Sequence, residues 1–392
     1  ISLDYNSFVG VIGVGRIQKG TVKRNMPLTL IDAEGNTRNG RMLKLYGFNG
    51  LERVEVETAQ AGDIIAFCGI DKLQISETLC DPANVEALPK LSIDEPTVSM
   101  TFQVNNSPFA GKEGKFITTR QISDRLDKEL QHNVALRVDP TDDPDKFRVS
   151  GRGELHLSVL IENMRREGFE MGVSRPEVII KEIDGVKSEP FEYVTIEVEE
   201  EHQGTIMERL GDRKGDLKDM VPDGKGRIRL EYIVPSRGLL GFQTEFLTAT
   251  SGSGLFYHVF DHYGPVKEGV VGSRVRGVLI SMAKGKAVDY SLYPLQARGE
   301  LLVVNGDEIY EGMLVGIHSR TNDLVVNPTK PKPLTNVRAS GTDESLTCAK
   351  IQKMTLEQSL EFISDDELVE VTPESIRLRK ILLTEIERKR SK

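Results

Sequence analysis

The stretch SGRGELHL, residues 150–157, decides the fold because it joins a predicted strand to a predicted helix. The run Phe147–Val149 precedes it as a strand, and a helix is predicted from Glu154 to Arg166. Apolar side chains recur along this helix at Leu155, Val159, Leu160 and Met164. Gly168 follows, and glycine commonly ends a helix. We therefore expect Leu155, Val159 and Leu160 to be buried against a sheet.

The segments around this stretch alternate between strands and helices. Residues 98–104 alternate as a strand, residues 117–130 carry apolar side chains at helical spacing, and residues 178–180 add a strand. The order strand, helix, strand, strand, helix, strand is the split βαβ arrangement of ferredoxin-like domains. The same order returns in residues 191–198, 204–210, 227–234, 239–247 and 256–260. Two α+β ferredoxin-like domains are predicted.

The first 92 residues show no helical periodicity and are predicted to be all-β. Short apolar runs alternate with turn signals such as Glu34-Gly35-Asn36. The runs are Val9–Val14, Leu28–Ile31, Arg41–Leu45, Val54–Val56 and Ile64–Phe67. Their spacing of roughly ten residues favours a small β-barrel. The Pro-punctuated segment from Asp81 to Pro96 suits a linker.

Residues 268–392 repeat nothing upstream and are predicted to form a mixed, mostly β C-terminal domain. Its predicted strands are Gly277–Ser281, Leu301–Val304 and Met313–Ile317. A long irregular stretch from His318 to about Asp343 follows them. An amphipathic helix then carries Met354, Leu356, Leu360 and Ile363, and a basic tail ends the chain. The predicted domains are residues 1–92, 93–184, 185–267 and 268–392.

The composition limits the class of protein. The chain has 392 residues, with 51 Lys and Arg against 60 Asp and Glu, a formal net charge of −9. No stretch approaches the roughly 18 apolar residues of a membrane-spanning helix. Cys68, Cys80 and Cys348 are too few for a disulfide framework and form no C-x-x-C pair. These features exclude a membrane protein and a disulfide-rich secreted scaffold, and they favour a cytoplasmic, multi-domain chain. Net acidity argues against coating DNA, although local basic patches still bind nucleic acid.

No catalytic, metal or cofactor site is predicted within the chain. The string nearest to a phosphate-binding loop, residues 111–116, lacks the first glycine at the right spacing and the Ser or Thr after its lysine. The pair Gly13 and Gly15 lacks the third glycine of a dinucleotide loop. His258 and His262 lie four residues apart with Asp261 between them, but a third convincing metal ligand is missing, so a structural role is favoured.

Basic residues gather in three places. Residues 271–298 contain five Lys and Arg residues and one acidic residue, Asp289. Residues 318–341 contain four Lys and Arg residues and one acidic residue, Asp323. Pro328, Pro331 and Pro333 stiffen the second segment, which reduces the ordering cost of docking it against phosphates. The terminal basic run is predicted to be mainly a solvated face. The candidate RNA-binding residues are Arg237, Arg274, Arg276, Lys284, Lys286, His318, Arg320, Asn322, Lys330, Lys332 and Arg338.

Several long motifs resemble one family of proteins. Residues 150–157, followed by residues 165–170 and 174–178, are similar to the third domain of elongation factor G and its relatives. Residues 10–20 and 61–64 resemble the second domain of translational GTPases. Residues 235–242 and 250–254 resemble their fifth domain. Together with the segment from Leu360 to Pro373, these motifs closely resemble the TypA/BipA family of translational GTPases over essentially the whole chain.

The resemblance implies the ribosome-binding part of such a factor. The family's GTP-binding domain is absent and the first residues already alternate as a strand, so we expect a C-terminal fragment without GTPase activity or cofactor. GTP and Mg²⁺ would belong to the full-length parent. The implied partners are the 70S ribosome, large-subunit rRNA and A-site tRNA, with no membrane and no DNA, and the chain is expected to be a cytoplasmic monomer. Family members are linked to stress response, virulence regulation and large-subunit assembly.

Three alternatives stay open at this point. The related factor LepA differs in its C-terminal domain, and the acidic helix and Pro-rich basic loop here favour TypA/BipA. A stand-alone metal hydrolase would use His258 and His262. A purely protein-binding scaffold would ignore ribosomes.

Overall fold

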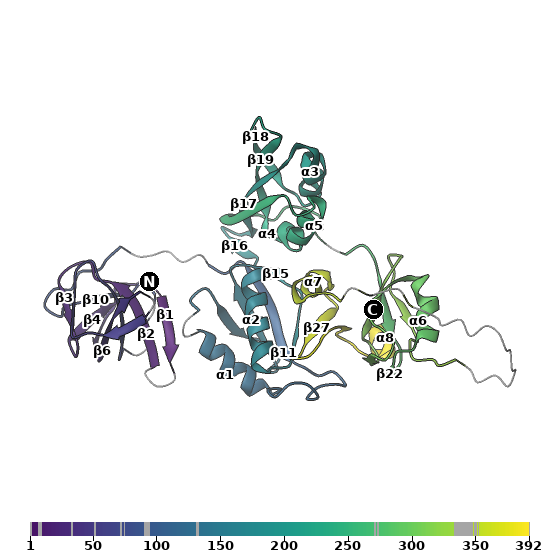
Figure 1. Cartoon of the computed structure of the whole chain (residues 1–392), viewed down its shortest axis with the longest axis horizontal. Coiled ribbons are helices and arrows are strands. Elements are labelled where there is room, and N and C mark those ends of the chain that lie inside the picture. Colours follow the sequence, from purple (N-terminus) through teal and green to yellow (C-terminus); the bar gives the residue numbers. More distant parts are fainter. Residues whose placement is uncertain are drawn as a thin grey trace. The chain divides into compact units, whose positions relative to one another are not determined.

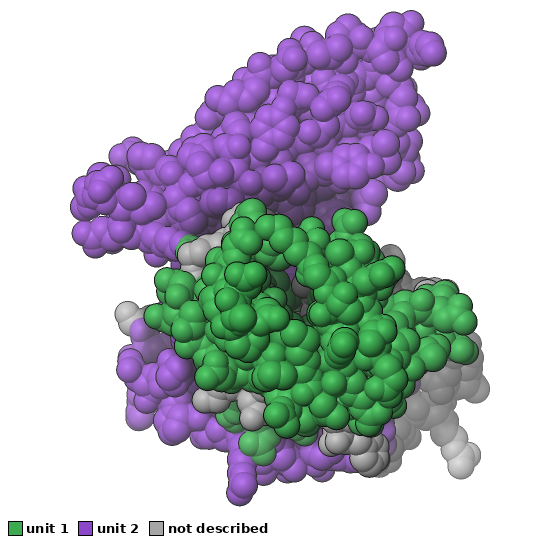
Figure 2. All heavy atoms as spheres, turned by 90° about the vertical axis from the view of Figure 1, so that its left-hand side faces the viewer, with its two compact units in different colours: residues 1–96, 123–138 green, residues 97–122, 139–392 purple. Residues whose placement is uncertain are grey.

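The computed structural model describes residues 2–6, 10–32, 34–50, 52–70, 73, 75–89, 95–130, 133–269, 272, 274–332, 348, 351 and 353–391. The chain divides into two compact units, coloured separately in Figure 2. Unit 1 is Ile1–Pro96 with Ser123–Val138, and unit 2 is Thr97–Ile122 with Asp139–Lys392. Helix α1 (Thr119–Leu130) therefore contains residues of both. No described helix is long and apolar enough to cross a membrane.

Unit 1 is built from antiparallel sheets, three of them within its described residues. The first has the order β1 (Ser2–Asn6), β2 (Gly10–Arg16), β9 (Ile64–Cys68), β6 (Lys44–Asn49) and β7 (Glu52–Glu55). The others are β10 (Thr78–Cys80), β4 (Pro27–Ile31) and β5 (Thr37–Arg41), and the pair β3 (Thr21–Lys23) and β8 (Thr58–Gln60). Leu30, Met42, Leu45 and Phe67 belong to one buried apolar cluster. The all-β prediction for this segment is confirmed.

One predicted strand of unit 1 is wrong, and one glycine of this unit has a packing role. The predicted strand at residues 41–45 is wrong, because β5 ends at Arg41 and β6 begins at Lys44. Gly13 lies inside β2, where an added Cβ would come within 2.4 Å of Leu73 and 2.5 Å of Phe67. Packing therefore favours glycine at position 13, whereas a Cβ at Gly15 would make only an ordinary contact with Phe67 at 3.9 Å.

The central sheet of unit 2 joins segments from both ends of it. Its order is β12 (Arg137–Pro140), β13 (Lys146–Gly151), β11 (Val98–Val104), β14 (Met171–Val173), β27 (Glu367–Val371) and β28 (Ile376–Lys380), with β15 (Glu177–Val178) also paired to β11. Val98, Met100 and Phe102 alternate into the core, as the sequence predicts. Strand β27 pairs with β14 antiparallel, so residues near the C-terminus extend a sheet that begins with a much earlier part of the chain (Figure 1).

Helix α2 (Glu154–Glu167) confirms the predicted helix and part of its predicted buried face, since Leu160 and Met164 are buried. Gly168 ends it in the left-handed conformation, at φ 102°. The buried side chains are Leu157, Ser158, Leu160, Ile161 and Met164. Leu155 and Val159 are 67% and 51% exposed, so their predicted burial is wrong. The helix therefore has two rows of apolar side chains. The row with Leu157, Leu160, Ile161 and Met164 is buried, and the shorter row with Leu155 and Val159 is exposed.

A second sheet of unit 2 is formed by residues 181–265. Its order is β16 (Lys181–Ile183), β17 (Val186–Glu199), β19 (Arg227–Pro235) and β18 (Asp216–Pro222), with β20 (Leu255–Pro265) paired to β17. The short helix η1 (Glu200–His202) leads into α3 (Gln203–Asp212), and α4 (Ser236–Leu239) precedes α5 (Phe242–Ala249). The single helix predicted over 239–247 is wrong, because Gly241 turns the chain at φ 70° between α4 and α5.

The remaining residues form a third sheet and three helices among the described residues. The sheet has the order β23 (Gly299–Leu301), β25 (Leu314–His318), β21 (Val278–Ser281) and β26 (Leu324–Val326), and β22 (Gly285–Lys286) pairs with β24 (Glu308–Ile309). The helices are α6 (Asp289–Gln296), α7 (Leu356–Phe362) and α8 (Glu385–Arg390). Residues 302–304 are not a strand, and β26 interrupts the stretch predicted to be irregular. Thr355 and Gln358 form a capping box that starts α7.

The buried row of α2 gives a direct stability prediction. Leu157 is fully buried, so Leu157→Ala should cost about 2–5 kcal/mol through lost apolar contacts and a cavity. Leu155→Ala, the matched change on the exposed row, should cost less than about 0.5 kcal/mol. Native-state hydrogen exchange at the amides of α2 and β11 measures both local free energies of opening. Equal losses of protection in the two variants would contradict this assignment of faces.

Candidate nucleic-acid interface

Three exposed lysines lie together beyond one end of strand β21. Lys284 and Lys286 flank Gly285, and Lys330 follows β26. An added Cβ at Gly285 would lie 3.2 Å from Cγ2 of Thr329, so this turn abuts the segment that carries Lys330. We call Lys284, Lys286 and Lys330 the lysine group. No described carboxylate lies within ion-pair distance of its three ammonium groups.

A second basic group lies beyond the other end of β21. The Arg320 carbonyl accepts from Gly277 N at 2.8 Å, and Ser319 N donates to the Arg298 carbonyl at 2.9 Å. Arg276 pairs with the exposed Glu300 at 2.9 Å. We call Arg276, Arg298 and Arg320 the arginine group. All three side chains are exposed.

The remaining candidates of this segment differ in their surroundings. His318 is buried and its Nδ1 lies 2.5 Å from the Asn322 carbonyl, so it holds the turn after β25 rather than facing solvent. Asn322 and Lys332 are exposed. Arg338 lies outside the described residues. The four residues of β21 separate the lysine and arginine groups by about 13 Å, at roughly 3.3 Å per residue.

Arg237 is the partner of a buried carboxylate. It lies in α4, and its Nε donates to Glu189 at 2.6 Å, while Glu189 is fully buried. The guanidinium also donates to the carbonyl oxygens of Lys267 and Gly269. These bonds satisfy a buried charge, which would be very costly without its cation. Arg237 therefore has a structural role that sequence alone did not suggest.

Arg274 has a comparable role in a larger cluster. Its two terminal nitrogens each donate to Glu367 at 2.8 Å. Lys380, only 3% exposed, lies 2.9 Å from the same carboxylate and 2.7 Å from both Asp323 and Asp366. Burial opposes the charge of Glu367, but the Arg274 hydrogen bonds and the Lys380 charge outweigh it and hold the pKa of this carboxyl below its ordinary value. The cluster fixes β28 to the segment that precedes β21.

The terminal basic run is not a solvated tail throughout, and that prediction is wrong for its first part. Arg377, Arg379 and Lys380 lie in β28, and Arg379 is fully buried. Arg377 pairs with Glu113 and, at 3.1 Å, with the fully buried Glu370. An arginine held between two such carboxylates is a structural residue. Lys389 and Arg390 remain exposed on α8.

Removing Arg377 should therefore destabilise the sheet. Arg377→Ala leaves the fully buried Glu370 without its cation, which should cost about 3–5 kcal/mol. Arg390→Ala removes one exposed charge and should change the free energy by less than about 0.5 kcal/mol. Hydrogen exchange at the amides of β27 and β28 reports both. Unchanged protection in Arg377→Ala would show that this ion pair does not stabilise the sheet.

The glycine-rich loop at residues 111–114 already holds an anion of the chain itself. Glu170 is fully buried, and its carboxylate accepts from Gly111 N at 2.7 Å, Glu113 N at 3.0 Å and Gly114 N at 2.8 Å. A Cβ at Gly114 would lie 2.3 Å from Glu170 Cγ, which explains the glycine. Backbone N–H groups of this kind cradle phosphates elsewhere. Here they are satisfied by an internal carboxylate.

The two histidines considered as metal ligands each face their own carboxylate. His258 Nδ1 lies 2.5 Å from Glu192, and His262 Nδ1 lies 2.6 Å from Asp261. The ring of His262 also stacks on Phe191, with centroids 5.2 Å apart. Among the described residues, neither histidine belongs to a group of three close metal-binding side chains. The structure does not bring them together as a metal site.

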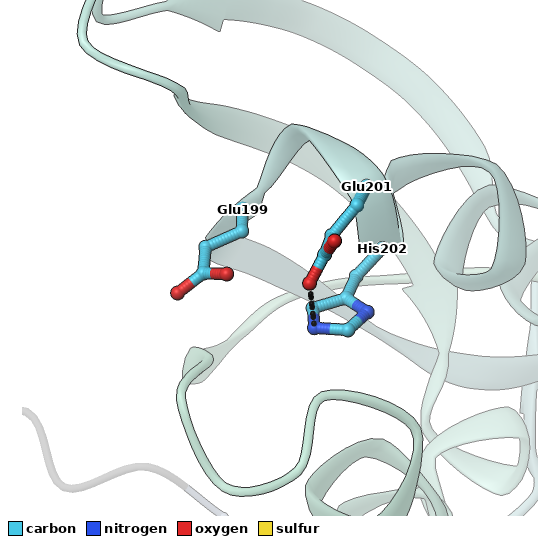
Figure 3. A group of neighbouring side chains, drawn as sticks. All are labelled: Glu199, Glu201 and His202. Carbon is cyan, nitrogen blue, oxygen red and sulfur yellow. Dashed lines mark ion pairs between the residues drawn. The ribbon is translucent and has the colours of Figure 1, made fainter.

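A different group does have ligand-like spacing. Glu199, Glu201 and His202 have potential ligand atoms within 4.8 Å of one another where β17 passes into η1 (Figure 3). His202 Nε2 lies 3.5 Å from Glu201, whose side chain is 73% exposed. Exposed acidic groups of this kind are common without a metal, so the cluster by itself does not define a site.

Glu154 is a largely buried carboxyl with few partners. Its Oε2 is 3.5 Å from Gly241 N, and its Oε1 has no hydrogen-bond partner among the described residues. Burial, and then the nearby charge of Glu361, raise the pKa of Glu154 to about 7. The folded chain therefore holds this proton more tightly than the unfolded chain does.

This shift predicts a pH-dependent stability. Above pH 7 the ionised Glu154 should cost the folded state about 3 kcal/mol, a cost that falls as pH drops from 7 towards the unfolded value near 4.5. Glu154→Gln should stabilise the protein at pH 8.5, and this gain should be about 2 kcal/mol smaller at pH 5.5. Urea unfolding at both pH values measures the difference. Glu208→Gln, on the exposed side of α3, controls for loss of one charge; an equal pH effect there would refute the assignment to Glu154.

Comparisons with known protein families match three parts of the chain. Residues 10–80 match elongation factor Tu domain 2, residues 186–273 match the elongation factor G C-terminus, and residues 276–385 match the TypA/BipA C-terminal domain. The third match favours TypA/BipA over the LepA alternative. These matches agree with a multi-domain, mostly β chain.

Similar proteins cover nearly all of this chain. The "Large ribosomal subunit assembly factor BipA" of Escherichia coli (strain K12) is 64% identical over 99% of it, and that of Haemophilus influenzae is 61% identical over 99%. The chain spans 64% and 63% of the lengths of these two relatives. A solved structure from Thermus thermophilus aligns with 68% of this chain over 55% of its own length, at 16% identity and a TM-score of 0.44.

Proposed function

The chain belongs to the TypA/BipA family of translational GTPases, and we propose that it is the ribosome-binding portion of a factor of this family. The observation that carries the proposal is its 64% identity, across 99% of its residues, to a protein named as a large ribosomal subunit assembly factor. Its own activity would be binding to rRNA at the factor site and to A-site tRNA. Stress response, virulence regulation and large-subunit assembly would depend on that binding, in the cytoplasm.

GTP hydrolysis is assigned in this proposal to a separate GTP-binding domain of the full-length factor, with Mg²⁺. The glycine-rich loop at residues 111–114 supports the assignment of GTP binding to another domain. Its backbone N–H groups are occupied by Glu170 and offer no cradle to a nucleotide phosphate. The described residues would therefore orient the factor rather than hydrolyse GTP.

The domain architecture is part of the same proposal. We assign a β-barrel to residues 1–92, ferredoxin-like domains to residues 93–184 and 185–267, and a family-specific domain to residues 268–392. The sheet orders around β11 and β17, each with helices between its strands, support the two ferredoxin-like assignments. Strands β27 and β28 would then be contributed by the last domain to the sheet of the second.

The candidate RNA-binding residues fall into two classes: cations that pair with buried carboxylates of the fold, and exposed cations. Arg237 and Arg274 neutralise buried glutamates, so phosphate binding would compete with the fold. The lysine and arginine groups are exposed and lie beyond opposite ends of β21. Lys284, Lys286 and Lys330 therefore carry the proposed RNA contact, because neutralising phosphates with cations that the fold does not use releases counterions at little structural cost.

The lysine group can be tested by salt-dependent binding to ribosomes. Changing Lys284, Lys286 and Lys330 to Ala should weaken co-sedimentation with purified large subunits and flatten the slope of log affinity against log salt by about 2 units. The matched control changes Lys353, Lys389 and Arg390, three other exposed cations, to Ala. Equal losses in both variants would show that general charge, and not this group, is responsible. A parent protein that does not sediment would refute the proposed function.

A further inference from the structure

The sheet formed by β16–β20 has one covered and one uncovered face. Helices α3 and α5 lie on one side of this sheet (Figure 1). Val194, Ile196, Leu230 and Val234 pack in one cluster with side chains of these helices. The opposite face carries apolar side chains in solvent. Their exposed fractions are 42% for Leu255, 59% for Tyr257, 60% for Val259 and 49% for Val221.

The strand register brings these side chains onto one surface. Val259 lies opposite Tyr193, Tyr257 opposite Thr195, and Leu255 opposite Glu197. On the next strand, Glu231 lies opposite Thr195 and Arg229 opposite Glu197. Asp219 and Val221 continue the rows on β18. We call this surface the open sheet face: Tyr193, Thr195, Glu197, Asp219, Val221, Arg229, Glu231, Leu255, Tyr257 and Val259.

The open sheet face is acidic as well as apolar. Glu197, Glu231 and Asp219 oppose one cation, Arg229, which already pairs with Glu231 at 2.9 Å. Tyr193 also donates to Glu231. A phosphate backbone laid across this surface would be repelled by its net negative charge. A segment of the opposite charge would be attracted.

One border of this surface also offers backbone groups. Strand β20 has 11 residues and pairs with β17 alone among the described strands. Its outer edge presents N–H and C=O groups that a further extended segment can pair with. The side chains of Tyr257 and Val259 would then contact every second residue of that segment.

We propose that the open sheet face docks a basic polypeptide segment, rich in Lys or Arg and carrying apolar side chains, that belongs to the large ribosomal subunit. Carboxylates of Glu197 and Asp219 attract its cations, and the row Leu255, Tyr257 and Val259 buries its apolar side chains. The inference rests on the proposed function and adds a protein partner to the RNA contacts of the lysine group. The two surfaces have opposite charge, so they bind opposite chemistries.

Charge reversal on the open sheet face tests this. Glu197→Lys with Asp219→Lys should weaken co-sedimentation with purified large subunits by roughly tenfold, because two attractions become repulsions. Glu34→Lys with Glu52→Lys, two exposed changes in unit 1, serves as the matched control and should have a small effect. Tighter binding after reversal would identify RNA as the occupant and overturn the proposal. An effect equal to the control's would also overturn it.

Cross-linking identifies the partner's chemistry directly. A photoreactive benzoylphenylalanine placed at Tyr257 should yield a product with a protein of the large subunit, and products with rRNA alone would overturn the inference. Hydrogen exchange at the amides of β17 in each altered protein should match that of the parent protein, which would show that the altered proteins are folded. If the parent sediments while cross-linking to protein fails, the inference alone is wrong. If the parent does not sediment, the proposed function and the inference both fail.

Discussion

The seven-stranded sheet of unit 2 is completed around one buried carboxylate, Glu370. It is fully buried in β27, where Asn105 donates to it at 3.2 Å, Ser107 at 3.0 Å and Arg377 at 3.1 Å, and Tyr310 adds a fourth hydrogen bond. A buried charge is tolerated only when such partners surround it. Because Asn105 and Glu370 are 265 residues apart in sequence, satisfying one charge fixes β27 and β28 beside β14.

Local sequence patterns were enough to predict most strands and helices, but not which faces are buried or which strands pair. The alternation of residues 98–104 and the glycine after α2 correspond directly to β11 and Gly168. The buried face of α2 was predicted only in part: Leu160 and Met164 are buried, but Leu155 and Val159 form a second apolar row that is exposed. Periodicity in the sequence identifies the apolar rows of a helix, but the sheet on which the helix packs determines which row is buried. The seven-stranded sheet was not predictable, since nothing local marks β27 as a partner of β14.

Charge patterns misled for a related physical reason. A basic residue in sequence carries no mark of whether its partner is a solvent ion, a phosphate or a buried glutamate. Arg377 and Lys380 appeared as parts of a basic tail, whereas each neutralises carboxylates inside the fold. The acidic residues could have indicated such internal partners, because Glu170 and Glu370 both stand among apolar residues in segments with a strand pattern. A carboxylate at such a position needs a cation or several N–H donors.

Among the described residues, the lysine group and two carboxylates of the open sheet face, Glu197 and Asp219, take part in no ion pair. The lysine group lies beyond one end of β21, and the open sheet face with Glu197 and Asp219 belongs to the β17 sheet. A partner made only of RNA would bind the first and be repelled by the second. A partner made only of basic protein would do the reverse. Both surfaces are used at once only by an assembly that presents phosphate and basic polypeptide together, and a ribosomal subunit has that composition.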